Sequence, residues 1–109
     1  MSHGILAKAS IKPTGYPMAY NVDEALGAVT YMESRNILVK FEGSRWNDSA
    51  VLFTAHYDTS SLAPGATDDT IAVVSLLQMA GYLAANQPER SIIILFDDGE
   101  EDGLHGSRV

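Results

Sequence analysis

The sequence contains no cysteine among its 109 residues. This absence excludes disulfides and thiolate metal ligands, so a metal ion could be held only by histidine, aspartate and glutamate. Apolar runs are short as well, because none reaches the roughly 18 consecutive residues that a membrane-spanning helix needs. The first residues also lack the basic and apolar regions of a signal peptide. We therefore expect no membrane contact from this segment.

Basic residues are scarce in the second half of the chain. The sequence has 14 acidic and 7 basic residues, which gives a formal net charge of −7. Residues 1–50 contain five of each sign, so the whole excess of negative charge lies in residues 51–109. Clustered carboxylates repel one another unless water or cations neutralise them. This distribution makes nucleic acid an improbable partner and is compatible with a cation site.

The N-terminal third is predicted to contain a lead-in followed by a β-hairpin. Residues 1–27 include Pro13, Gly15 and Pro17 and show no clear periodicity, so we expect a poorly ordered segment. Two β-rich runs follow, at residues 28–33 and 36–42, and a short polar turn joins them. This pattern is typical of a hairpin.

The rest of the chain has a strand–helix–strand pattern. Residues 50–55 and 91–96 are nearly continuous apolar runs, as in buried strands. Between them, apolar residues recur with helical spacing over residues 69–86, and Pro88 ends the pattern. This order implies a right-handed crossover between parallel strands. The predicted fold class is α/β: an N-terminal β-hairpin plus the strand–helix–strand unit of a mixed central sheet.

Polar clusters follow both buried strands. His56 and Asp58 come directly after the first strand, and Glu100 and Glu101 follow the second. Ligands in such folds bind outside the carboxyl ends of the strands, so the two clusters should meet at one edge of the sheet. Asp68 ends the loop after the first cluster and can reach the same edge.

These residue types could bind metal ions and move a proton. An aspartate beside a metal-bound imidazole can accept its second N–H, so Asp58 could orient His56, or it could only stabilise a turn. Asp68 could bridge two cations, or it could cap the following helix. One of the two adjacent glutamates could bind metal while the other transfers a proton, although charge runs are often solvated loops.

Taken together, the three motifs resemble those of metallopeptidase family 28. The matching residues are His56-x-Asp58, Gly65-Ala66-x-Asp68-Asp69 and Glu100-Glu101-x-Gly103-Leu104-x-Gly106-Ser107. The resemblance covers residues 28–109. Residues 31–43 and 62–69 are most similar to the fungal vacuolar membrane protease branch of this family.

The resemblance implies a role for each residue. His56 would bind one zinc ion and Glu101 a second, while Asp68 would bridge the two. A cis peptide follows this aspartate in many members. Asp58 would orient His56, and Glu100 would be the general base. The implied activity is that of a zinc-dependent exopeptidase of the aminopeptidase type, in which a water molecule activated by two zinc ions attacks a peptide substrate.

The resemblance also bears on domain organisation and location. Family members complete the site with a further aspartate and a second histidine downstream, whereas this sequence ends at Val109. We therefore expect residues 28–109 to be the N-terminal part of an incomplete aminopeptidase-type α/β/α domain. The fungal branch implies the vacuolar membrane or the secretory pathway, and the glycosylation sequon at Asn47 is consistent with this.

Two alternatives remain open. A related amidohydrolase and carboxypeptidase family also uses His-x-Asp and Glu-Glu motifs, but the step from Asp58 to Asp68 is typically longer there. Single-zinc His-Glu-x-x-His proteases are excluded, because that motif is absent. The alternative of a different class is an inactive fragment or homologue that binds cations or a partner without turnover, since a site short of ligands loses metal affinity.

Overall fold

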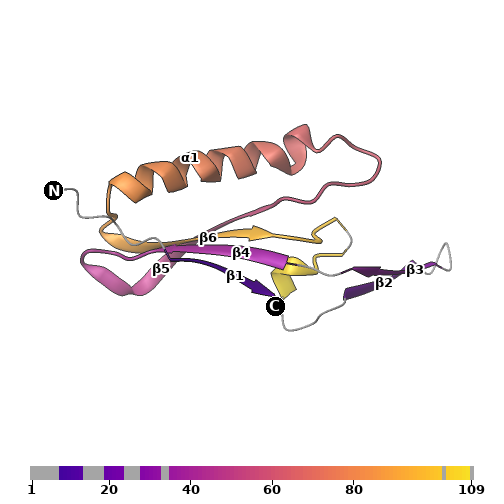
Figure 1. The fold of residues 1–109 in the computed structure, drawn as a ribbon, viewed down its shortest axis with the longest axis horizontal. Coiled ribbons are helices and arrows are strands. Elements are labelled where there is room, and N and C mark those ends of the chain that lie inside the picture. Colours follow the sequence, from indigo (N-terminus) through magenta and orange to yellow (C-terminus); the bar gives the residue numbers. More distant parts are fainter. Residues whose placement is uncertain (1–7, 14–18, 24–27, 33–34, 102, 109) are drawn as a thin grey trace.

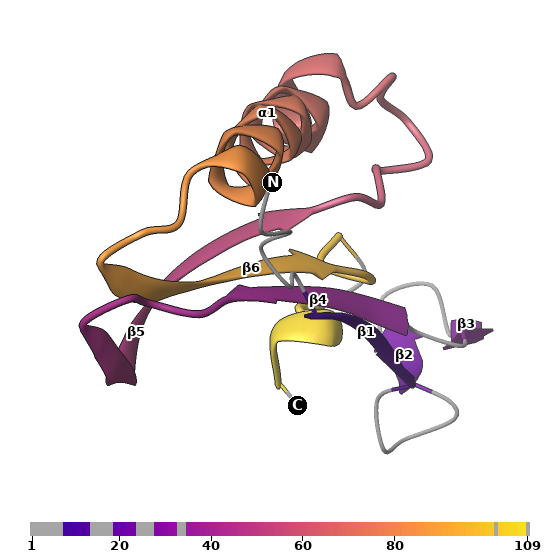
Figure 2. The same ribbon diagram turned by 60° about the vertical axis from the view of Figure 1, so that its left-hand side comes forward.

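The computed structural model describes residues 8–13, 19–23, 28–32, 35–101 and 103–108. A four-stranded sheet has one long helix over one face, and a separate two-stranded ribbon extends beyond one end of the sheet (Figure 1). The strand order in the sheet is β1 (Lys8–Pro13), β4 (Arg35–Phe41), β6 (Arg90–Asp97) and β5 (Trp46–His56). The helix, α1 (Ile71–Ala85), lies above β5 and β6 (Figure 2). The α/β class is confirmed.

Parallel strands form the half of the sheet that lies nearest the helix. β5 and β6 pair in parallel, with Val51 opposite Ile92 and His56 opposite Asp97. On its other side, β6 pairs antiparallel with β4, so the sheet is mixed, as predicted. The strand–helix–strand unit is therefore confirmed. β5 begins at Trp46, four residues before the predicted run 50–55, and its register with β6 shifts between Trp46 and Ala50.

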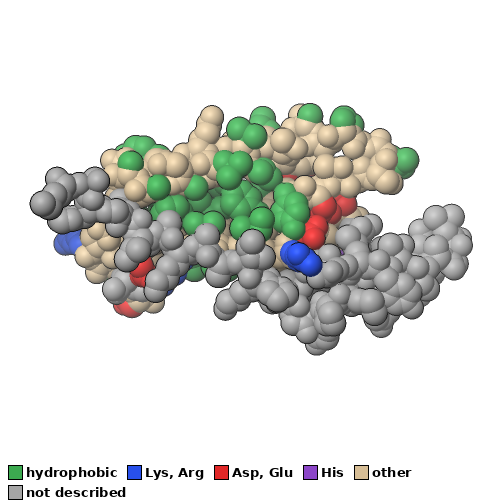
Figure 3. Space-filling model, viewed as in Figure 1, with side chains coloured by type: hydrophobic (Ala, Val, Ile, Leu, Met, Phe, Trp, Pro, Cys, Tyr) green, Lys and Arg blue, Asp and Glu red, His purple; other side chains and the backbone are tan. Residues whose placement is uncertain are grey.

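The hydrophobic core lies between α1 and the sheet. Phe41, Leu83, Ile94 and Phe96 are buried there, and apolar side chains of α1 pack around them. Hydrophobic side chains fill the space below α1 in Figure 3. Ile94 is 0% exposed, and burying such a side chain contributes about 1.5–3 kcal/mol. This packing fixes β6, the strand from which the Glu-Glu turn emerges.

The predicted pairing of residues 28–33 with residues 36–42 is wrong. β3 (Ala28–Met32) instead pairs antiparallel with β2 (Ala19–Asp23), and these two strands form the N-terminal hairpin. β4 pairs with β1 and β6, which use both of its backbone edges. The alternation of side chains indicates that a run forms a strand, but it does not identify the hydrogen-bonding neighbour.

Regular structure also occurs within residues 1–27, where the sequence predicted none. β1 joins the edge of the main sheet, with Lys8 opposite Lys40 and Pro13 opposite Arg35. An edge strand can include proline, because one of its rows of N–H groups lacks a partner strand. The domain boundary at residue 28 stays a prediction. No helix in the described part of the chain is long and apolar enough to cross a membrane.

Candidate metal centre

The ends of β5 and β6 bring the two polar clusters side by side. His56 is the last residue of β5, and it lies opposite Asp97, the last residue of β6. The next amide, that of Tyr57, donates to the carbonyl of Asp97 at 3.0 Å. Pairing therefore continues to the edge of the sheet, where both chains turn away. The segments after these strands meet at this edge, as the sequence predicted.

The imidazole of His56 is buried and faces an acceptor on each side. Its Nδ1 lies 3.0 Å from the backbone oxygen of Asp58, and its Nε2 lies 3.0 Å from Asp68 Oδ1. Glu100 Oε2 is 3.9 Å from Nε2. Burial lowers the pKa of His56, but the hydrogen bonds to Asp68 and Asp58 and the charges of nearby carboxylates raise it more, to a net value above 6.5.

The surroundings of His56 suit a cation. Two acceptors around one ring favour the imidazolium, in which both nitrogens carry hydrogen. The carbonyl of Asp58 can only accept, so Nδ1 keeps its hydrogen and Nε2 is the nitrogen that can exchange a proton for a metal ion. A metal ion at Nε2 would supply the positive charge that the neighbouring carboxylates stabilise. The donor set of imidazole and carboxylates is one that zinc accepts.

Asp58 holds the turn that follows β6. Its Oδ1 accepts the backbone N–H of Glu100 at 3.2 Å, and its Oδ2 accepts that of Glu101 at 3.1 Å. Its carboxylate lies 3.4 Å from His56 Nδ1, farther than its own carbonyl oxygen does. The sequence predicted that Asp58 contacts His56, but not that Asp58 also accepts hydrogen bonds from the backbone of both glutamates. Nothing in the spacing of the motifs indicated it.

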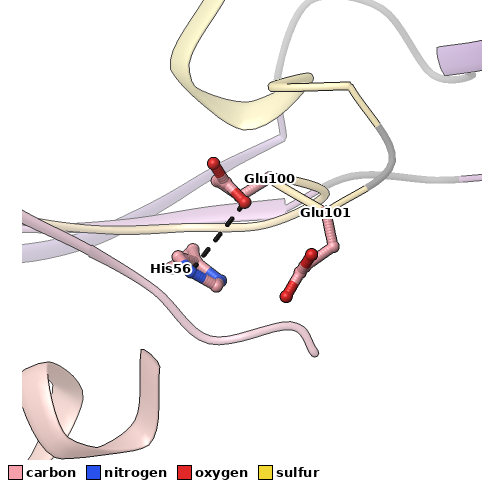
Figure 4. Close-up of side chains that lie close together, drawn as sticks. All are labelled: His56, Glu100 and Glu101. Carbon is pink, nitrogen blue, oxygen red and sulfur yellow. Dashed lines mark ion pairs between the residues drawn. The ribbon is translucent and has the colours of Figure 1, made fainter. Parts of the chain in front are cut away.

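The turn that presents the glutamates has an unusual backbone. Gly99 and Gly103 have φ values of 70° and 113°, a region that glycine enters at little cost. The amide of Leu104 donates to the carbonyl of Glu100 at 2.8 Å. This turn directs the side chains of Glu100 and Glu101 toward His56 (Figure 4).

The centre of the site is a group of three residues. One ligand-type atom from each of His56, Glu100 and Glu101 lies within 4.8 Å of the other two. Asp68 contacts His56 but lies outside this group, and its side chain is 76% exposed. It belongs to the turn Ala66–Thr70, and a cis peptide joins it to Asp69. All five predicted site residues therefore come to one edge, and three of them form a compact cluster.

Comparison with known proteins gives a family match. Residues 36–109 match the family described as Peptidase family M28. The chain is similar to the vacuolar membrane protease of Laccaria bicolor (strain S238N-H82 / ATCC MYA-4686), with 50% identity over 84 residues. That match covers 76% of this chain and 8% of the relative, so the chain spans less than a tenth of that protein.

Two solved structures share the fold. A glutaminyl cyclase from an Acidobacteriales bacterium has a TM-score of 0.71 and 26% identity, over 92% of this chain and 35% of that one. A Zn-dependent exopeptidase from Parabacteroides distasonis has a TM-score of 0.64 and 27% identity, over 94% of this chain and 36% of that one. These proteins differ in reaction, so function must be argued from the site and not from the fold.

Proposed function

Because this chain belongs to peptidase family M28, we propose that it supplies part of the active site of a zinc-dependent exopeptidase of the aminopeptidase type. The observation that carries the proposal is the convergence of ligand-type atoms from His56, Glu100 and Glu101 within 4.8 Å. The relative from Laccaria bicolor is a vacuolar membrane protease, which supports a vacuolar location and a peptide substrate for the protein that contains this segment.

His56, Asp68 and Glu101 would hold two zinc ions. His56 Nε2 would bind one ion and the carboxylate of Glu101 the other. Asp68 Oδ1 lies beside His56, and a carboxylate can give one oxygen to each of two cations. When bound, zinc polarises the peptide carbonyl and makes a water molecule acidic.

Glu100 is assigned the proton transfers. Its side chain is 34% exposed and therefore accessible to water at the edge of the sheet. As general base it takes a proton from the water that attacks the peptide carbonyl, and it then gives that proton to the leaving amine. Asp58 fixes the backbone of Glu100 and Glu101 and so holds the base beside the zinc ligand.

The aminopeptidase preference follows from charge. Clustered carboxylates with little basic compensation favour a positively charged group nearby, and the free N-terminal ammonium of a peptide is such a group. An N-acetylated peptide has no such charge. We therefore expect the protein to cleave residues from free N-termini and to reject the acetylated counterparts.

The test measures hydrolysis by the protein expressed with its complete reading frame. Aminoacyl and N-acetyl-aminoacyl p-nitroanilides would be compared before metal removal, after dialysis against a chelator, and after addition of zinc. We expect activity on the free-amine substrate that is lost with the metal and restored by zinc. Hydrolysis that survives metal removal would contradict the proposal, and equal rates on both substrates would contradict the aminopeptidase preference.

A second candidate is a module that binds cations or a partner without turnover. The observation that favours it is the position of Asp68, which lies outside the compact cluster and is largely exposed. This candidate predicts that zinc binds and that no substrate is cleaved at any zinc concentration. The same experiment therefore separates the two functions.

A further inference from the structure

Asn36, near the start of β4, ties together both ends of the loop that carries the two glutamates. This metal-binding loop comprises residues 98–106. The Asn36 Nδ2 donates to the carbonyl of Gly106 at 2.6 Å, and Asn36 Oδ1 accepts the backbone N–H of Asp98 at 3.1 Å. The partners fix the orientation of the amide, because a carbonyl only accepts and an N–H only donates. One half-buried side chain thus closes the loop with two hydrogen bonds.

The ends of the loop touch at this point. Gly106 is buried, and a Cβ atom there would lie 2.3 Å from the backbone oxygen of Asp98 and 2.7 Å from Asn36 Oδ1. No side chain fits at that distance without movement of the backbone. The junction therefore requires glycine at position 106, and Asn36 links the two ends.

Arg35, the residue before Asn36, links β4 to the segments that follow β5 and β6. The amide of Arg35 donates to Asp98 Oδ2 at 3.1 Å, and the hydroxyl of Tyr57 donates to the carbonyl of Arg35. The start of β4 is thus tied to the segment after β5 and to the segment after β6. β4 itself contributes no residue to the cluster of three ligand-type side chains.

The loop must hold its carboxylates against their repulsion. Asp68 Oδ1 and Glu100 Oε2 both face His56 Nε2, at 3.0 and 3.9 Å, and like charges that converge on one atom repel one another. Asp58 holds the middle of the loop through two backbone amides. The hydrogen bonds of Asn36 hold its ends. Without them, only Asp58 and the backbone hydrogen bonds within the loop would set the separation of the two glutamates from His56.

We propose that Asn36 is a positioning residue that closes the metal-binding loop and so keeps Glu100 and Glu101 against His56. This inference rests on the proposed function for its effect on zinc, but not for its effect on the loop. Asn36 acts through the backbone of Asp98 and Gly106. Loss of a residue that orients metal ligands typically costs about 10–100-fold in metal affinity.

The test is a calorimetric zinc titration of the protein with its complete reading frame and of its variants. Asn36→Leu removes both hydrogen bonds and keeps the branched shape of the side chain. The first control is Asn86→Ala. It removes a side-chain amide that donates to the carbonyl of Tyr82 at 3.0 Å, at the end of α1. A second control, Leu83→Ala, weakens the core without touching the loop. We expect zinc affinity to fall at least about tenfold in Asn36→Leu and to stay within about twofold in both controls.

Amide hydrogen exchange provides a readout that does not depend on zinc. In metal-free Asn36→Leu, the amides of Asp98, Leu104 and His105 should exchange faster, while those of α1 keep their rates. Unchanged exchange in the loop, or an equal loss of zinc affinity in Leu83→Ala, would overturn the role of Asn36 and leave the proposed function standing. Absence of zinc binding by the unaltered protein with its complete reading frame would instead count against the proposed function, and exchange would still decide the role of Asn36.

Discussion

His56 Nε2 lies 3.0 Å from Asp68 Oδ1, so a residue at the end of β5 contacts the turn that precedes α1. In the metal-free chain a proton on the imidazole satisfies this contact. The raised pKa of His56 follows from it, together with the other acceptors and charges around the ring. Proton and metal ion therefore compete for the same nitrogen.

The stability of the metal-free chain should depend on this proton. A folded-state pKa raised above 6.5 gives a stabilising contribution that is complete below about pH 6.5 and is lost as the pH rises through the folded value. We expect thermal unfolding in chelator to shift to lower temperature across that range. Asp68→Asn should flatten the dependence, whereas Asp69→Asn should leave it intact. Identical pH profiles for the two variants would disprove the assignment to Asp68.

Replacing Asp58 should loosen the Glu-Glu turn. Asp58→Ala leaves the backbone N–H groups of Glu100 and Glu101 without their acceptor. The Glu100 N–H is half-buried and the Glu101 N–H is exposed to water, so we expect the free energy of unfolding to fall by about 1 kcal/mol, the net contribution of a typical hydrogen bond. Urea denaturation of Asp58→Ala beside Asp48→Ala, an exposed aspartate in β5, measures the difference. Equal stability of the two variants would refute this role for Asp58.

Single substitutions should distinguish the role of Glu100 in proton transfer from the role of Glu101 in zinc binding. In the protein with its complete reading frame, Glu100→Gln should keep its zinc content and lose about 10²–10⁴-fold in kcat, because the amide cannot take a proton. Glu101→Gln should lose zinc as well as activity. Zinc content by atomic emission and initial rates of hydrolysis measure both effects. The matched control is Glu89→Gln, at an exposed ion pair with Arg45. An unchanged kcat in Glu100→Gln would show that Glu100 is not the general base.

Two glycines should respond in opposite directions to alanine. Gly65 has a φ of +69°, and a Cβ there would lie 2.1 Å from Thr59 Cγ2. We expect Gly65→Ala to destabilise the chain by about 1–2 kcal/mol or more and to disturb the turn that carries Asp68. Gly81 lies within α1, where a Cβ meets nothing within 4 Å. Gly81→Ala should therefore stabilise by about 0.5–1 kcal/mol. Chemical denaturation of both variants measures the two changes in stability. A gain in the stability of Gly65→Ala would refute the steric argument.

Periodicity explains which parts of the fold could be predicted. The runs at residues 50–55 and 91–96 and the helical spacing between them are local patterns, so the parallel pair and its helix followed from them. The partner of β3 could not be predicted, because strand pairing depends on contacts far apart in sequence. β1 and β2 were missed because proline and glycine near them obscured any alternation.

The same distinction applies to the candidate site. His56, Asp68 and Glu101 were identifiable as ligand types placed after predicted strands and loops. The hydrogen bonds that hold them were not identifiable, because a side chain bonded to a distant backbone leaves no periodic signal. In the sequence Asn36 was only the first residue of the predicted run 36–42, although its partners Asp98 and Gly106 are 62 and 70 positions away.

The parallel pairing of β5 and β6 also determines when during folding the site can exist. Asp58 and Glu100 are 42 positions apart, and α1 must cross the sheet before they can meet. Closing such a long segment is slow compared with forming a helix or a tight turn. The two halves of the cluster therefore cannot meet until β5 and β6 have paired. A metal ion that needs both halves would select the native state from the folding ensemble and raise the melting temperature in proportion to the logarithm of its concentration.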